Sequence, residues 1–259
     1  MAEPLAVTRD GAAAWMSFTR PSSANSIDLE FARAFREQAE QLEADESCSV
    51  LVLSGDARFF SAGGDVRAMN TDDDPAAYLA ELVDTLHTAI ARLAASRLVV
   101  VSVVEGTAAG AGFALVLNSD LVVSGDRARY LAAYGSVGLT PDTGLSYLLP
   151  RVVGERRAAE LTLLGRVLDA ETALSWGLVN EVVPSKRLHE RAAEIVRTLA
   201  RAAQPALAET KRLLTAGRTS TFAEHLQDER DTIVGAIATP AAKTRIDEFL
   251  GRSSEVRHP

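Results

Sequence analysis

The sequence is short of cysteine, since Cys48 is the only one among 259 residues. A single thiol excludes an internal disulfide framework and a metal site of clustered thiolates, so we expect a reducing compartment such as the cytoplasm.

Basic residues are fewer than acidic ones, with 27 lysines and arginines against 35 aspartates and glutamates. A formal net charge of −8 argues against nucleic acid or an anionic membrane as a general partner.

Long hydrophobic runs are missing as well. The most membrane-like segment, 98–123, is divided by Glu105 and by the polar cluster 118–120 into pieces too short to insert into a bilayer. The opening MAEPLAVTRDG lacks the basic and then apolar order of a secretory leader. With 47% hydrophobic residues, the chain can instead bury a full core.

Strand and helix patterns alternate through most of the chain. Asp10-Gly11 predicts a tight hairpin turn, and 49–54 reads as a buried strand. Apolar residues at helical spacing predict helices over 31–42 and 76–95. The segment 98–124 predicts a strand, a glycine turn, a buried helix and another strand. This alternation indicates an α/β protein.

Strand patterns disappear in the last quarter of the chain. A capping box at 221–224 and a Thr-Pro pair at 239–240 predict helix starts, and Gly251 predicts the end of the last helix. We therefore divide the chain into an α/β core over 1–195 and a helical region over 196–259.

Two loops rich in small residues follow buried strands, FFSAGGDV at 59–66 and GTAAGAGF at 106–113. The second is not a dinucleotide fingerprint, because Leu115 occupies the third glycine position. One such loop alone indicates only close packing of a helix on a sheet. Two loops, however, can direct two backbone N–H groups at one ligand. Such an anion hole suits a thioester oxygen that becomes an enolate.

These loops, together with VGLTPDTGLSYLLPRVVGERRAAELTLLGR and DAETALSWGLVNEVVP, resemble the enoyl-CoA hydratase/isomerase (crotonase) superfamily over nearly the whole chain. The pattern is most similar to the group of enoyl-CoA isomerases and epoxyphenylacetyl-CoA isomerases of phenylacetate breakdown. The resemblance implies a spiral of ββα units with a C-terminal helical trimerisation region, assembled as a homotrimer or a dimer of trimers. It also implies an acyl-CoA thioester substrate, with coenzyme A as part of the substrate, no further cofactor and no metal.

The resemblance assigns site residues position by position. Gly64 and Ala111 match the two oxyanion-hole positions, the second of which is glycine in many relatives. Hydratases of the superfamily use two glutamates, whose positions here hold Ala114 and Tyr134, so hydration by two carboxylates is not expected. Asp142 matches an acidic residue that works alone in some isomerases. The expected catalytic set is Asp142, Gly64 and Ala111; the expected substrate-binding set is Ser22, Ser23, Ala24, Ala62, Gly63, Gly64, Asp65, Val66, Ala111 and Tyr134.

Other readings stay open at this point. Asp142 could be a helix N-cap, Tyr134 could donate a hydrogen bond or only fill space, and Asp65 could be a carboxylate that fixes its loop. The variable segment 67–80 is expected to shape the acyl pocket. The histidines form no triad and are interpreted as surface or packing residues: His87, His189, His225 and His258. The protein could also be a non-catalytic acyl-CoA binder, or use the same hole for hydrolysis or carbon–carbon cleavage.

Overall fold

The computed structural model describes residues 3–255, and the interpretation of His258 lies outside them. The chain starts with an antiparallel hairpin of β1 (Leu5–Asp10) and β2 (Ala13–Phe18), followed by η1 (Pro21–Ser23) and α1 (Leu29–Ala44). The elements that follow up to the last strand are β3 (Val50–Ser54), β4 (Phe59–Ser61), α2 (Val66–Thr71), α3 (Pro75–Ala95), β5 (Val99–Val104), β6 (Thr107–Ala109), α4 (Ala111–Leu117), β7 (Leu121–Gly125), β8 (Arg129–Leu131), η2 (Ala133–Val137), α5 (Leu145–Val153), α6 (Glu155–Leu163), β9 (Leu168–Asp169), α7 (Ala170–Ser175) and β10 (Glu181–Val183).

The strands form two sheets, and from β3 to β8 successive strands alternate between them. The larger sheet has the order β1-β2-β3-β5-β7-β10, and the smaller one has the order β4-β6-β8-β9. In the repeats that start at β3, β5 and β7, the first strand joins the larger sheet, the second joins the smaller, and one or more helices follow. The expected spiral of ββα units is therefore confirmed by the topology.

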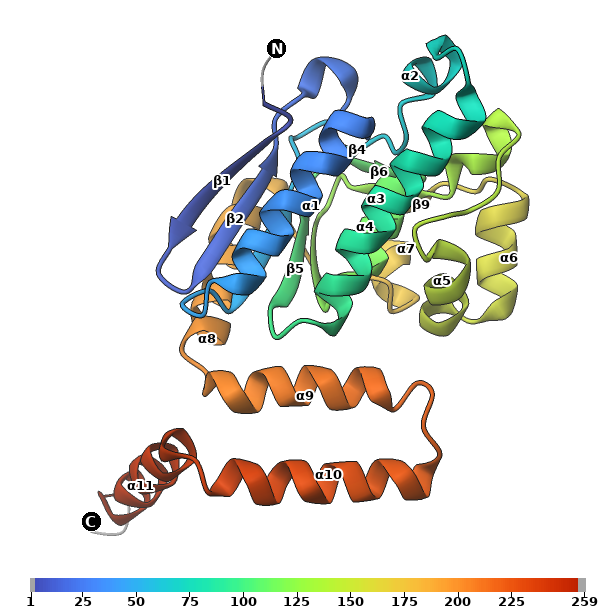
Figure 1. Cartoon of the computed structure of the whole chain (residues 1–259). Coiled ribbons are helices and arrows are strands. Elements are labelled where there is room, and N and C mark those ends of the chain that lie inside the picture. The colour runs from blue at the N-terminus through green and yellow to red at the C-terminus, as the bar shows by residue number, and fades with distance from the viewer. Residues whose placement is uncertain (1–2, 256–259) are drawn as a thin grey trace.

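The central parallel strands of the larger sheet are buried on both faces, as is usual for parallel sheets, whereas its edge strands β1 and β10 are partly exposed. Every residue of β3 and of β5 is buried. Helices α1 and α3 lie side by side over one face, in front of the sheet in Figure 1. Helix α8 (Leu188–Ala200) covers the other face with Leu188, Ala192 and Val196. The apolar periodicity of these helices, read from the sequence, thus corresponds to real buried faces.

The C-terminal helices lie below this core. After α8 come α9 (Gln204–Ala216), α10 (Phe222–Ile237) and α11 (Pro240–Glu255), and Figure 1 shows α9 and α10 as an antiparallel pair. The boundary predicted after residue 195 falls inside α8. The capping box of Thr221 and Glu224 is confirmed, whereas Gly251 does not end the last helix.

A buried lysine ties α9 to the core. The Lys211 Nζ donates to the carbonyls of Leu93 and Leu98 at 2.9 and 2.6 Å and forms an ion pair with Asp120 at 2.9 Å. These partners account for all three ammonium protons, which makes burial of the charge tolerable. The start of the helical region is therefore fixed to the core by polar as well as apolar contacts.

Sequence patterns did not predict the shortest elements. The strands β4, β6 and β8 have three residues each, and α2 has six.

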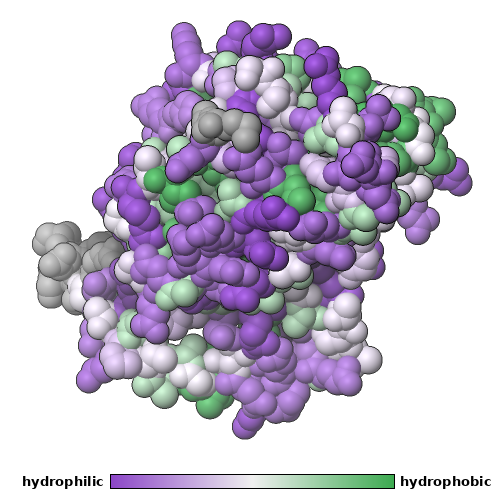
Figure 2. Space-filling view, turned by 45° about the horizontal axis from the view of Figure 1, so that its top comes forward, coloured by the Kyte–Doolittle hydropathy of each residue, from purple (hydrophilic) through white to green (hydrophobic). Residues whose placement is uncertain are grey.

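On the face seen in Figure 2, hydrophilic residues predominate and hydrophobic ones form separate patches. Among the described helices, none is both long and apolar enough to cross a membrane.

Candidate active site

A cavity of about 360 Å³ lies beside α3, between the two loops of small residues. Its walls are largely apolar, and Tyr134 and Asp142 are the ionisable residues among those that line it. The lining consists of Ile27, Ala62, Gly64, Val66, Met69, Leu79, Leu82, Val83, Leu86, Gly110, Ala111, Ala133, Tyr134, Ser136, Val137, Leu139, Thr140 and Asp142. Met69 and Leu79 come from the variable segment that was expected to shape the acyl pocket.

A short parallel bridge pairs Gly64 with Ile27, but its hydrogen bonds do not use the Gly64 N–H. Ile27 N–H donates to the Gly63 carbonyl at 2.8 Å, and Asp65 N–H donates to the Ile27 carbonyl at 2.9 Å. Because alternate peptide groups of an extended chain point to opposite sides, the Gly64 N–H is directed away from Ile27. Gly64 itself lines the cavity, so this donor can serve a ligand there.

The N–H of Ala111 is the second available donor. Ala111 is the first residue of α4, and the N–H groups of a first helical turn have no partner within the helix. Gly110 before it has φ 51° and ψ −124°, a conformation that needs glycine. A Cβ on Gly63 would lie 2.7 Å from the Ala109 carbonyl oxygen. The small residues therefore bring the two loops, and hence the two donors, close together.

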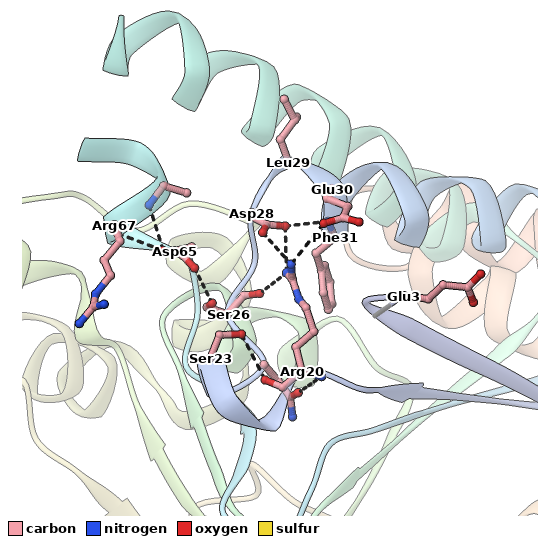
Figure 3. Close-up of polar contacts among 12 residues, drawn as sticks. Glu3, Arg20, Ser23, Ser26, Asp28, Leu29, Glu30, Phe31, Asp65 and Arg67 are labelled. Atoms are coloured by element: carbon pink, nitrogen blue, oxygen red, sulfur yellow. Dashed lines mark hydrogen bonds and ion pairs between the residues drawn. The ribbon is translucent and has the colours of Figure 1, made fainter. Parts of the chain in front are cut away.

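A polar network holds the loop of Gly64 from the outside (Figure 3). The Asp65 carboxylate accepts from the Ser26 Oγ at 2.8 Å and from the N–H groups of Arg67 and Ala68, both at 3.0 Å, so it caps α2. The Arg20 guanidinium donates to the Ser26 carbonyl at 2.8 Å. The carboxylate of Asp65 is thus occupied in fixing its loop.

Arg20 also forms a two-pronged contact with Asp28, at 2.6 and 2.9 Å. Burial by itself would raise the pKa of Asp28, but the hydrogen bonds from Arg20 and from the Phe31 N–H outweigh it. The pKa of Asp28 therefore lies below its ordinary value. An ionised Asp28 in turn keeps the entry into α1 and the neighbouring Ile27 in place.

Asp142 faces Tyr134 across the cavity rim. The Tyr134 hydroxyl donates to the Asp142 Oδ1 at 2.6 Å, and Oδ2 makes no hydrogen bond within the described residues. Burial, followed by the charge of Asp142, raises the pKa of Tyr134, so the phenol stays protonated as a donor. The cap of α5 is Gly144 and has no side-chain hydrogen bond. The reading of Asp142 as a plain N-cap is therefore wrong.

Among the residues that the structure describes, Asp142 is the one carboxylate in the lining of this cavity. Tyr134 lines it, and Ala114 is fully buried in the hydrophobic core. The two positions that the resemblance matched to the hydratase glutamates thus place a neutral phenol at the cavity and a methyl group in the core. Within residues 3–255, no group of three or more His, Cys, Asp or Glu side chains could hold a metal ion.

The predicted site residues divide into two groups. The cavity is lined by Ala62, Gly64, Val66, Ala111, Tyr134 and Asp142. The others are not among the residues that line it: Ser22, Ser23, Ala24, Gly63 and Asp65. Ala24 is connected to the cavity through its carbonyl, which accepts from the Ala62 N–H at 3.0 Å. Ala24 therefore adjoins the cavity wall, and no such contact connects Ser22 or Ser23 with the lining residues within the described part of the chain.

Sequence reasoning missed two residues that contact the backbone beside Asp142. His87 on α3 and Asn118 at the end of α4 both form hydrogen bonds with Thr143. No local motif indicated them, because each lies more than twenty residues from its partner in the chain.

Comparisons with known proteins support a common origin. A family model described as enoyl-CoA hydratase/isomerase matches residues 8–255. The chain is 36% identical to 1,2-epoxyphenylacetyl-CoA isomerase of Escherichia coli, over 92% of each chain. It is 31% identical to 4-chlorobenzoyl coenzyme A dehalogenase-2 of an Arthrobacter species, over 98% of this chain and 92% of the relative. A crystal structure of an enoyl-CoA hydratase from a Polaromonas species has a TM-score of 0.91 and 29% identity, with 96% and 97% of the two chains covered.

Proposed function

Because this chain belongs to the enoyl-CoA hydratase/isomerase family and has the crotonase fold, we propose that it is an enoyl-CoA isomerase. In this proposal the N–H groups of Gly64 and Ala111 stabilise a thioester enolate, and Asp142 moves the proton. The substrate is an acyl-CoA thioester whose acyl part occupies the apolar cavity beside α3.

The observation that carries this proposal is the lone carboxylate. Asp142 is the carboxylate among the residues that line the cavity, and the positions used by hydratases hold Ala114 and Tyr134. Addition of water needs groups that hold and activate a water molecule. Migration of a double bond needs a single base that removes a proton and returns it elsewhere on the same molecule.

The reaction can be written for a 3-enoyl-CoA. Asp142 removes a proton from C2, and the electron pair moves into the thioester to give a dienolate. The negative oxygen is stabilised by the two backbone N–H groups, which act more strongly in an apolar site than in water. The protonated Asp142 then delivers the proton to C4, which yields the conjugated 2-enoyl-CoA and restores the carboxylate.

Tyr134 determines which carboxylate oxygen does this work. Its hydroxyl occupies Oδ1 of Asp142, so Oδ2 is the oxygen that exchanges the proton. A fixed carboxylate can reach both C2 and C4 on one face of the planar dienolate. The raised pKa of Tyr134 keeps this donor protonated throughout the reaction.

Relatives suggest related chemistry for the same site. The 36% identity to a 1,2-epoxyphenylacetyl-CoA isomerase favours ring-derived acyl groups and a role in phenylacetate degradation. The 31% identity to a 4-chlorobenzoyl coenzyme A dehalogenase favours a second candidate, in which the lone carboxylate acts on a halogenated aromatic thioester. A non-catalytic acyl-CoA binder is the third alternative.

The C-terminal helices support a proposal about assembly. Helix α10 exposes Phe222, Leu226, Ile233 and Ile237, which recur at helical spacing. An apolar strip of this kind is usually covered in a working assembly. We propose that other copies of the chain cover it in a homotrimer or a dimer of trimers.

We also propose a cytoplasmic location, which rests on the single cysteine.

A panel of CoA esters tests the proposed activity. We expect the purified protein to convert a 3-enoyl-CoA into its conjugated isomer, followed by absorbance, and to hydrate crotonyl-CoA at a far lower rate. Release of chloride from 4-chlorobenzoyl-CoA without isomerisation would establish the second candidate. Binding of all the esters without any turnover would establish the binder.

A further inference from the structure

Thr143, the residue after Asp142, has an unfavourable backbone conformation and a buried hydroxyl without a hydrogen bond. Its φ is 55°, in the left-handed region that β-branched residues rarely adopt. The residue is 1% exposed, and its Oγ1 is buried without a hydrogen-bond partner. Both features cost free energy, and such states persist only where the surroundings impose them.

Two hydrogen bonds hold the backbone on either side of Thr143. Its N–H donates to the Nε2 of His87 at 2.9 Å, and its carbonyl accepts from the Nδ2 of Asn118 at 2.9 Å. Asn118 is itself fixed by donating to the Ala114 carbonyl at 2.8 Å. The two contacts come from different helices, α3 and the end of α4, so together they define the position of Thr143.

The bond to His87 acts directly on Asp142. The N–H of Thr143 belongs to the peptide unit that joins it to Asp142, and this unit is planar. Fixing the N–H therefore fixes the plane from which the Asp142 side chain projects towards Tyr134. His87 accepts through Nε2, so it is a neutral imidazole with its proton on Nδ1.

We propose that His87 is a positioning residue for Asp142. Through the Thr143 N–H it holds Asp142 in the orientation in which Oδ1 meets Tyr134 and Oδ2 is available to the substrate. This inference rests on the proposed function, because it concerns the proton transfer by Asp142. His87 also connects that transfer to α3, whose Leu82, Val83 and Leu86 line the acyl cavity.

Three variants on α3 test the role of His87. His87→Ala removes the acceptor, His87→Gln supplies an amide oxygen near the place of Nε2, and Thr88→Ala is a matched control at the neighbouring exposed position. We expect His87→Ala to lower kcat for the double-bond shift about 10- to 100-fold, with KM within about threefold, because small displacements of a reacting group are costly. His87→Gln should recover much of kcat, and Thr88→Ala should match the wild type.

Other results would overturn the proposal. They are a His87→Ala variant whose kcat stays within about twofold of the wild type, or a loss that appears in KM alone. Failure of the proposed function is recognised separately, since the wild type would then show no double-bond shift or Asp142→Asn would retain it. In that event hydrogen–deuterium exchange of a peptide spanning 140–147 decides whether His87 holds the loop. Faster exchange in His87→Ala than in Thr88→Ala supports the positioning role, and equal exchange refutes it.

Discussion

In the proposed mechanism two backbone N–H groups stabilise the negative charge, and a substitution at Ala111 can remove one of them. Ala111 is the first residue of α4, a position at which proline is well tolerated because its N–H has no helical partner. Ala111→Pro therefore deletes one donor of the anion hole while keeping the helix. We expect kcat to fall about 10²- to 10³-fold, as measured by the double-bond shift.

The control for this change is Ala111→Gly. Glycine keeps the N–H and removes only a methyl group from a residue that is 5% exposed. Activity should stay within a few-fold of the wild type. If Ala111→Pro were as active as Ala111→Gly, the hole would not be formed by this N–H.

Tyr134 can be tested with equal precision. Tyr134→Phe keeps the ring that lines the cavity and removes the hydroxyl that donates to Asp142. A hydrogen bond to a charged group contributes about 1.5–3 kcal/mol, so we expect kcat to fall roughly tenfold or more through a less fixed carboxylate. KM should change little, and circular dichroism should show an intact fold. An unchanged kcat would mean that Tyr134 only fills space.

At this scale the sequence led to candidate residues for the chemistry but not to the residues that hold them in place. Asp142, Gly64 and Ala111 were identified because they lie within motifs that can be read along the chain. His87 lies at the surface, as interpreted, but its hydrogen bond with Thr143 was not predicted, because the two residues are 56 positions apart. Contacts between distant segments depend on the packing of α3 against the loop, and a single sequence does not reveal that packing.

Among the elements, the loop between β2 and α1 offers a test based on pH. The pKa of Asp28 is lowered in the folded protein, so its ionised form stabilises the fold above the ordinary pKa of about 4. This contribution disappears as the pH falls through the lower, folded value. Asp28→Asn keeps an N-cap for α1 but removes the charge opposite Arg20.

We expect Asp28→Asn to lower Tm by roughly 5 °C at pH 7. The difference from the wild type should shrink as the pH falls below about 4. Thermal unfolding followed by circular dichroism at several pH values measures it. A Tm difference between the two proteins that is the same at pH 7 and pH 3 would show that Asp28 acts through packing rather than charge.

Element length decided which parts of the fold the sequence could predict. The helices α1 and α3 and the strand β3 have enough residues to show a period, and they were predicted within a few residues. The strands β4, β6 and β8 have three residues each, and β4 and β6 lie inside the two loops of small residues. Helix α2 depends on the cap from Asp65, which follows two glycines and gave no periodic pattern.

For the whole molecule, the exposed strip on α10 predicts association. Ile233 and Ile237 are 68% and 65% exposed. Light scattering should give three or six times the chain mass of 27.6 kDa for the wild type. The double change Ile233→Asp and Ile237→Asp should give monomers, because buried carboxylates would oppose association. A monomeric wild type would contradict the assembly proposal without affecting the site.

The central claim is that Asp142 alone moves the proton between two carbons of an enolate. Its most direct test is to incubate the wild type and Asp142→Asn with a 3-enoyl-CoA in deuterated water. Absorbance follows conjugation, and mass spectrometry follows the label. Asparagine retains the shape and the hydrogen bond from Tyr134 but is not a base. We predict conjugation with label exchange at C2 and C4 in the wild type and loss of both in Asp142→Asn. Equal conjugation and exchange in the two proteins would contradict the account.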